Sequence, residues 1–207
     1  MTYPDRTAAG RVLGARLEHL RASMPLVLGL PRGGVPVAAA VRSVIGGDLD
    51  ILLVRKLGVP WQPELAMGAI GEQGVRVLNP DVIRHTGVSR AELARVERLE
   101  RAELERRLAV WRGSGGPVPI GGRTAIIVDD GMATGATVVV ACRVVRLHQP
   151  ARVVVAVPVS SSEAVHRAAG EADEVVCPLV PPDLGGVGTA YRDFHQLADE
   201  EVSVLLA

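Results

Sequence analysis

Aromatic side chains, thiols and net charge are all scarce in this 207-residue chain. The aromatic residues are Tyr3, Trp61, Trp111, Tyr191 and Phe194, so the core must consist mainly of aliphatic side chains. Such a core is typical of parallel strands that are covered by helices and are apolar along their whole length. Because Lys+Arg and Asp+Glu both number 23, no overall charge attracts nucleic acid or an anionic membrane, and we expect neither as a partner.

The cysteine and histidine patterns exclude further classes of protein. Cys142 and Cys177 lie far apart in apolar stretches, so we expect buried thiols and no redox or zinc pair. The five histidines show no metal-ligand spacing. No apolar run is long enough to cross a membrane, and the sequence begins without a signal-peptide pattern. We therefore expect a soluble, cytoplasmic protein.

Strand-like and helix-like segments alternate about five times along the chain. The expected strands are 25–30, 50–54, 124–128, 152–159 and 174–180, and the expected helices are 6–22, 35–44, 89–111, one ending near 148, one starting near 160, and 199–206. Residues 57–80 predict a mobile loop that leads into a β-hairpin with its turn near Gln73-Gly74, and 113–122 form a Gly/Pro-rich connection. The pattern predicts an α/β fold with one twisted, mainly parallel sheet flanked by helices, in a single domain over residues 1–207.

Unusual polar clusters follow three of the expected strands. They are Arg32-Gly33-Gly34, Arg55-Lys56 and the segment 129–137. In open parallel sheets, ligands bind beyond the carboxyl ends of the strands. The three clusters therefore predict where the binding site lies.

The segment 129–137 combines two acids with a loop of small and hydroxyl residues that opens a helix. Backbone amides at the helix N-terminus, together with the hydroxyls of Thr134 and Thr137, would bind a phosphate. Asp129 and Asp130 would repel that phosphate, so hydroxyl groups of a sugar are better partners for them. A sugar with a 5-phosphate and free 2- and 3-hydroxyls would satisfy both halves of the segment.

This segment resembles the phosphoribosyl-pyrophosphate signature of type I phosphoribosyltransferases, in which an apolar strand and two acids precede a loop ending in Thr-Gly-x-Thr. The resemblance implies that 5-phosphoribosyl-1-pyrophosphate (PRPP) binds to Asp129, Asp130, Gly131, Met132, Ala133, Thr134, Gly135, Ala136 and Thr137. It covers nearly the whole chain and implies the type I fold. The core would span about 24–180, and a hood would comprise about 181–207 with the N-terminal segment. Homodimers could form.

Two basic clusters resemble further parts of the family's site. Residues 28–34 resemble the pyrophosphate loop, in which Arg32 and the amides of Gly33 and Gly34 would bind the leaving group. Residues 54–58 resemble the basic strand end that precedes the flexible catalytic loop in adenine-type members. Either Arg55 or Lys56 would face the site, and we favour Lys56.

The tail 180–188 resembles the hood segment of hypoxanthine–guanine enzymes, which implies a base site at Asp183 and Leu184. Those enzymes have an aromatic ring that stacks on the base where this chain has Leu184 and Gly185. They also have an acid at the position of Ala133, where adenine-type members have alanine. These departures leave the acceptor base unidentified.

The resemblance implies Mg²⁺-dependent transfer of the phosphoribosyl group from PRPP to a nitrogenous base, a reaction of purine or pyrimidine salvage that releases pyrophosphate. Lys56, Asp129 and Asp130 are the predicted catalytic residues: Lys56 would offset charge on pyrophosphate, and the two acids would hold the ribose. We expect no direct protein ligand for Mg²⁺, which substrate and water would hold near Asp129 or Asp130.

Other readings of the same residues stay open. Closure of the segment 57–74 would exclude water, and Glu64 or Glu72 could handle the proton of the acceptor. The same site could instead run phosphorolysis or hydrolysis of a nucleotide. The alternative from a different class is a non-catalytic regulator that senses PRPP, an interpretation supported by the missing base-stacking ring.

Overall fold

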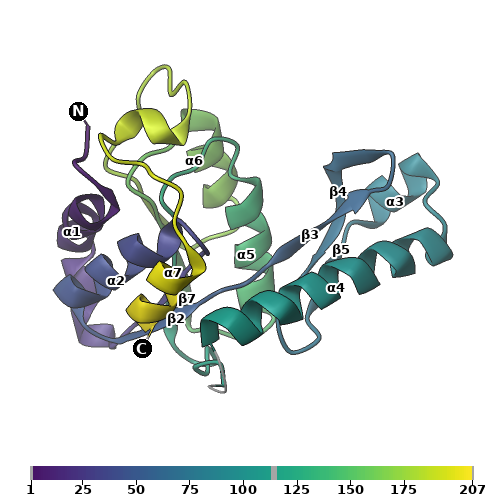
Figure 1. The fold of residues 1–207 in the computed structure, drawn as a ribbon, viewed down its shortest axis with the longest axis horizontal. Coiled ribbons are helices and arrows are strands. Elements are labelled where there is room, and N and C mark those ends of the chain that lie inside the picture. Colours follow the sequence, from purple (N-terminus) through teal and green to yellow (C-terminus); the bar gives the residue numbers. More distant parts are fainter. Residues whose placement is uncertain (1, 113–115, 207) are drawn as a thin grey trace.

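The computed structural model describes residues 2–112 and 116–206 and contains two β-sheets (Figure 1). The strands of the larger sheet are β1 (Leu26–Gly29), β2 (Asp48–Ile51), β6 (Thr124–Val128), β7 (Arg152–Ala156) and β8 (Glu174–Val176). Those of the smaller sheet are β3 (Arg55–Val59), β4 (Gln62–Ile70) and β5 (Arg76–Leu78). The helices are α1 (Arg6–Arg16), α2 (Gly34–Ile45), α3 (Pro80–Thr86), α4 (Arg90–Arg112), α5 (Ala136–Arg146), α6 (Ser162–Ala169) and α7 (Asp199–Leu206), with the 3₁₀ helices η1 (Glu18–Ser23) and η2 (Val187–Ala190).

The larger sheet is parallel throughout, with the strand order β2-β1-β6-β7-β8. Strand β6 lies in its middle, and all of its residues are buried. Successive side chains point to opposite faces, so that Ile127 packs with residues of α5 and α6 whereas Ile126 packs with residues of α1 and α2. Helices thus cover both faces, and the predicted α/β fold with a mainly parallel sheet is confirmed.

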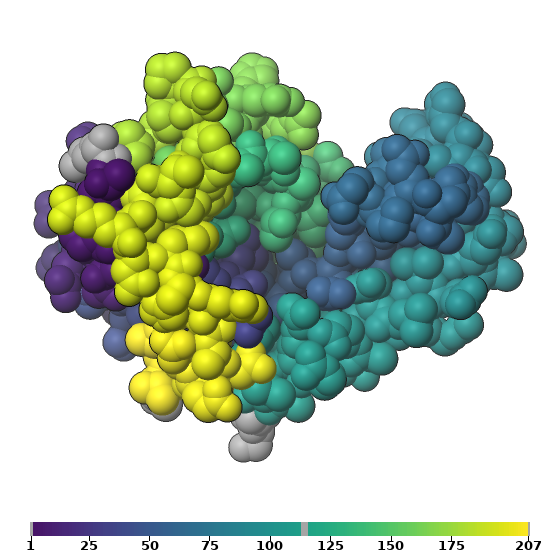
Figure 2. Space-filling view, turned by 45° about the horizontal axis from the view of Figure 1, so that its top comes forward, coloured from purple at the N-terminus to yellow at the C-terminus, as the bar shows by residue number. Residues whose placement is uncertain are grey.

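Strands β3, β4 and β5 form an antiparallel sheet that projects from this body together with α3 and α4 (Figures 1 and 2). We call this unit, residues 55–112, the arm. In its apolar core Leu57, Met67 and Ile70 are buried with Leu104 and Trp111 of α4, and this core continues into the body through Val35 and Ile51. The predicted hairpin is therefore part of a layered unit that helix α4 supports.

The boundaries predicted for this region need correction. The turn at Gln73-Gly74 is present, with φ values of 54° and 77°. The segment 57–74 is however not a loop, because most of it forms β3 and β4 and buries side chains against α4. Its glycines and prolines favour an irregular chain, but the burial of Leu57, Met67 and Ile70 against α4 stabilises paired strands instead.

The expected strand 50–54 is also divided. Strand β2 ends at Ile51, and Arg55-Lys56 open β3 instead of ending a strand of the parallel sheet. Leu52 and Leu53 connect the two sheets and are buried in different cores, Leu52 in the body and Leu53 in the arm. A buried connection has the same apolar composition as a buried strand, so the sequence does not distinguish them.

Helix α4 begins as predicted. The amide of Ser89 donates to the Glu92 carboxylate at 2.9 Å, and the Glu92 amide donates to Ser89 Oγ at 3.2 Å, which completes the capping box. Glu103 and Arg107, four positions apart on this helix, form an ion pair at 2.6 Å.

Helix α3 was not predicted, although its signals are present in the sequence. The Asn79 side chain accepts from the amide of Val82, Pro80 occupies the first helical turn, and Gly87 ends the helix with φ 68°. The glycines and prolines around this short helix favour an irregular chain, so the sequence pattern does not predict it.

The C-terminal segment divides between two neighbours. Leu184, Ala190 and Tyr191 pack with Tyr3 of the N-terminal segment, whereas α7 packs on α4 and α2. Helix α7 has the predicted limits. Strands β7 and β8 end before residues 159 and 180, and only isolated β-bridges continue beyond them.

Of the predicted connection 113–122, residues 113–115 lie outside the described residues. In the described part of the chain, no helix combines the length and apolar character needed to span a bilayer.

Candidate functional site

A cavity of about 380 Å³ lies at the carboxyl edge of the parallel sheet, where the arm joins the body. Its lining residues are Leu30, Pro31, Leu52, Leu53, Val54, Arg55, Lys56, Glu64, Arg107, Thr134, Ala136, Thr137 and Val140. We call it the sheet-edge cavity. It brings together the basic cluster at the root of the arm and the loop before α5, which are far apart in sequence.

A second cavity of about 370 Å³ adjoins the first, in the hollow that Figure 2 shows between the arm and the body. It lies between strands β4 and β5 on one side and helices α5 and α6 on the other, and it shares Ala136 and Val140 with the sheet-edge cavity. Among the described residues, no aromatic ring lines either cavity.

Strand β6 delivers Asp129 and Asp130 next to the loop that lines the sheet-edge cavity. The Asp130 amide donates to Asp129 Oδ1 at 2.9 Å. Burial raises the pKa of Asp129 well above its usual value, and the neighbouring Asp130 carboxylate raises it further. Burial also raises the pKa of Asp130, but a hydrogen bond from Arg6 opposes this rise. Two carboxylates in this setting are stabilised by a ligand that donates hydrogen bonds.

Arg6 is a site residue that the sequence did not reveal. Its Nε donates to Asp130 Oδ2 at 2.9 Å, and its Nη1 donates to the carbonyl of His195 at 3.0 Å. The guanidinium lies 4.0 Å from the centre of the Phe194 ring. The hydroxyl of Tyr191 donates to the backbone carbonyl of Asp130. Helix α1 and the C-terminal segment therefore hold Asp130 in place, while Asp129 has no such basic partner among the described residues.

The loop 131–137 leads from these acids into α5. Gly135 has a φ of 74°, a conformation that favours glycine, and it ends the loop at the start of the helix. Thr134 and Thr137 lie at this helix N-terminus and line the sheet-edge cavity. Met132, in contrast, is buried in the core. The loop thus offers hydroxyls to a ligand while Met132 anchors it.

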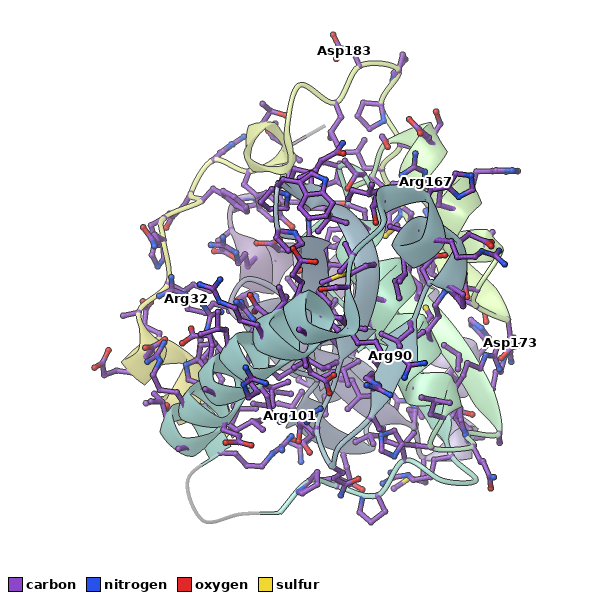
Figure 3. The ribbon with its side chains drawn as sticks, turned by 90° about the vertical axis from the view of Figure 1, so that its right-hand side faces the viewer. Arg32, Arg90, Arg101, Arg167, Asp173 and Asp183 are labelled. Atoms are coloured by element: carbon purple, nitrogen blue, oxygen red, sulfur yellow. The ribbon has the colours of Figure 1, made fainter. Side chains whose placement is uncertain are left out.

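The predicted pyrophosphate loop lies directly against the two acids. A Cβ atom on Gly33 would lie 1.9 Å from Asp130 Oδ2, and one on Gly34 would lie 2.4 Å from the carbonyl of Val128. Arg32, however, extends toward α7, where its Nη1 lies 3.8 Å from Asp199 Oδ1 (Figure 3). Arg32 does not line the sheet-edge cavity.

Gly33→Ala should both weaken the fold and displace Asp130. Gly33 has a φ of −61°, so its backbone accepts alanine and the conflict is only steric. Overpacking of this kind costs about 1–3 kcal/mol, which chemical denaturation would measure. Gly116→Ala is the control, because a Cβ there meets no atom within 4 Å. Equal stability of the two variants would contradict the close packing of this loop on Asp130.

The two basic residues at the start of the arm, Arg55 and Lys56, are each paired with an acid. Lys56 Nζ lies 3.1 Å from Glu64 Oε2, and Arg55 lies 2.5 Å from Glu100 Oε2. Lys56 is the only lysine of the chain, which otherwise has arginine at every cationic position. Glu64 is almost fully exposed, with 95% of its side chain accessible. The sheet-edge cavity therefore has the character of an anion site whose cations have exchangeable partners.

The remaining predicted residues lie elsewhere. Glu72 forms a buried ion pair with Arg112, away from the sheet-edge cavity. Asp183 stands at the outer end of a C-terminal loop (Figure 3), and Leu184 packs into the cluster around Tyr3. Neither lines the cavities described above. Among the described residues, no three His, Cys, Asp or Glu side chains converge as a metal site.

The parallel sheet with two acids after its central strand and a hydroxyl-bearing loop before α5 is the fold of type I phosphoribosyltransferases. A family model for the phosphoribosyl transferase domain matches residues 7–191. The chain belongs to this family.

Individual relatives agree with this membership. The chain is 52% identical over 204 residues to a protein of Mycobacterium tuberculosis that carries the provisional name phosphoribosyl transferase Rv0571c. The match includes 99% of this chain but 46% of that protein, so the chain spans about half the length of its curated relative. The structure of TT1426 from Thermus thermophilus is 45% identical with a TM-score of 0.92, covering 100% of this chain and 98% of the other. The structure of AQ2163 from Aquifex aeolicus shares the fold at 13% identity, with a TM-score of 0.51 and coverage of 84% and 74%.

Proposed function

We propose that this chain binds PRPP and transfers its phosphoribosyl group to a nitrogenous base, with release of pyrophosphate. The observation that carries the proposal is the meeting of Lys56, Thr134 and Thr137 around one cavity, beside the carboxylates that end β6. The threonine hydroxyls and the N-terminus of α5 suit the 5-phosphate. Asp129 suits the ribose hydroxyls, and Lys56 suits the diphosphate.

The residues would act mainly by position and charge. As the bond from C1 to the diphosphate breaks, negative charge grows on the leaving group, and the cations of Arg55 and Lys56 would offset it. Asp129 would hold the sugar in the reactive orientation. Glu64 already contacts Lys56 and is the better of the two predicted candidates for handling the acceptor's proton.

The proposed Mg²⁺ ion would be held mainly by the diphosphate and water, since the described residues offer no cluster of three metal ligands. Asp129 and Asp130 have oxygen atoms of the type that Mg²⁺ prefers, but Arg6 already occupies one carboxylate oxygen of Asp130. When bound, the ion would supply further neutralisation of the diphosphate oxygens.

One observation favours the alternative of a PRPP sensor. The proposed base site at Asp183 and Leu184 lies outside both cavities, and no ring from the described residues lines them. A protein without a base site could bind PRPP and report its concentration without transfer.

Pyrophosphate release distinguishes the two functions. We expect release from PRPP and Mg²⁺ to depend on one member of a panel of nucleobases. Occupancy can be followed separately, because Lys56 is the only lysine and an amine-reactive label should modify it less when PRPP is bound. Protection of Lys56 without release for any base would establish the sensor, and the absence of both would refute PRPP binding.

A further inference from the structure

Arg107 lies in the sheet-edge cavity although it belongs to none of the three polar clusters of the sequence. It comes from helix α4 of the arm and lines the cavity together with Pro31, Arg55 and Lys56. About one third of its side chain is exposed, at 34%. A guanidinium carries donors in a planar fork that matches two phosphate oxygens, which makes it a better partner for phosphate than for a neutral group.

The position of Arg32 means that another residue must provide the guanidinium for the diphosphate. Arg32 was expected to provide the guanidinium for the diphosphate, but it faces Asp199 on α7 at 3.8 Å and does not line the cavity. The arginines that do line the cavity are Arg55 and Arg107. Both guanidinium groups that line the cavity are thus supplied by the arm.

The ion pairs show which of the two arginines can turn to a ligand without leaving its carboxylate partner unpaired. Glu100, the partner of Arg55, pairs with no second cation among the described residues. Glu103, the partner of Arg107, also accepts two hydrogen bonds from Arg106, at 2.8 and 2.9 Å. Glu103 therefore keeps a bidentate partner when Arg107 turns to a ligand, and no carboxylate is left unpaired.

We propose that Arg107 is a binding residue for the diphosphate of PRPP, contributed by the arm. The proposal rests on the proposed function and adds to it a specific role for α4. It predicts that Arg107 discriminates PRPP from ribose 5-phosphate, which has the same sugar and 5-phosphate but lacks the diphosphate.

The test compares Arg107→Gln with Arg106→Gln by titration calorimetry in the presence of Mg²⁺. Both variants remove one partner of Glu103, but Arg106 is 60% exposed and does not line the cavity. We expect Arg107→Gln to bind PRPP and inorganic pyrophosphate about tenfold more weakly, a loss comparable with one charge-assisted hydrogen bond, and to bind ribose 5-phosphate as before. Arg106→Gln should match the unaltered protein for all three ligands.

Each other result has a defined meaning. An equal loss for ribose 5-phosphate would assign Arg107 to the 5-phosphate or to the shape of the cavity and overturn the proposal. Unchanged PRPP affinity would overturn it as well, while leaving the proposed function intact. Failure of the unaltered protein to bind PRPP would overturn both. Should Arg107→Gln not fold, Arg107→Lys keeps the charge without the fork, and a selective loss of PRPP affinity is expected from it; equal affinity would count against the proposal.

Discussion

Replacing Arg112 with methionine is expected to lower the free energy of unfolding by about 3–5 kcal/mol, the cost of leaving one side of a buried ion pair unpaired. Arg112 is 11% exposed and ends α4, where it pairs with Glu72 of the arm's turn and with Asp50 of β2 at 2.9 Å. It also donates to the carbonyl of Ile51 at 3.1 Å. Methionine fills similar space but leaves two carboxylates without their cation.

The same network joins the arm to the body. The second oxygen of Asp50 accepts from the amide of Val118 at 2.8 Å, so the chain beyond α4 is held by the same carboxylate. For a chain of this length, the expected loss corresponds to a fall in Tm of about 10 °C. The fall should be accompanied by easier separation of the arm, visible as faster hydrogen exchange in β3 and β4 than in β6.

Arg101→Met is the matched control on the same helix. Arg101 is 30% exposed and pairs with Glu97, which keeps a second partner in Arg76. Because Glu97 keeps Arg76 and the pair is only partly buried, we expect Arg101→Met to cost about 0–1 kcal/mol and to leave the denaturation midpoint nearly unchanged. If both variants lose the same stability, the buried network around Arg112 does not anchor the arm.

Local patterns in the sequence predicted most of the body. Alternation of apolar strands with helices indicated the parallel sheet, and the acids at positions 129 and 130 marked the end of its central strand. The limits of α7 and the start of α4 were also correct, because residues within one turn decide where a helix begins. These features depend on neighbours in sequence, where spacing carries the physical information.

Contacts over long separations were missed. Arg6 and Asp130 are 124 positions apart, and no periodicity indicates their pairing. Arg107 and Arg112 lie among the many charged residues of α4, and the sequence does not distinguish them from solvated neighbours. Only the three-dimensional packing of the arm distinguishes these two side chains from exposed neighbours such as Arg106.

Asp129→Asn should weaken PRPP binding on the order of a hundredfold. The proposed role of Asp129 is to accept hydrogen bonds from two ribose hydroxyls, and bonds to a charged group contribute about 1.5–3 kcal/mol each. Asp129 is a better test than Asp130, because Asp130 also neutralises the buried Arg6 and its replacement would weaken the fold. Asparagine keeps an oxygen that can accept from the Asp130 amide, as Asp129 Oδ1 does.

The same substitution should stabilise the empty protein at neutral pH. Burial raises the pKa of Asp129 well above its usual value, with a further rise from Asp130, so the carboxyl group ionises less readily in the folded protein than in the unfolded chain. Stability associated with a raised carboxyl pKa is present below the unfolded-state pKa and is lost as the pH rises through the folded-state pKa. Asparagine does not ionise and avoids that loss. We therefore expect Asp129→Asn to have a higher Tm than the unaltered protein at pH 7, and the difference to disappear in acid.

A residue that binds the ligand but destabilises the empty fold should show these opposite effects: its replacement lowers PRPP affinity and raises Tm. A fall in both PRPP affinity and Tm would instead indicate that Asp129 is a structural residue, and an unchanged affinity would remove it from the sugar site.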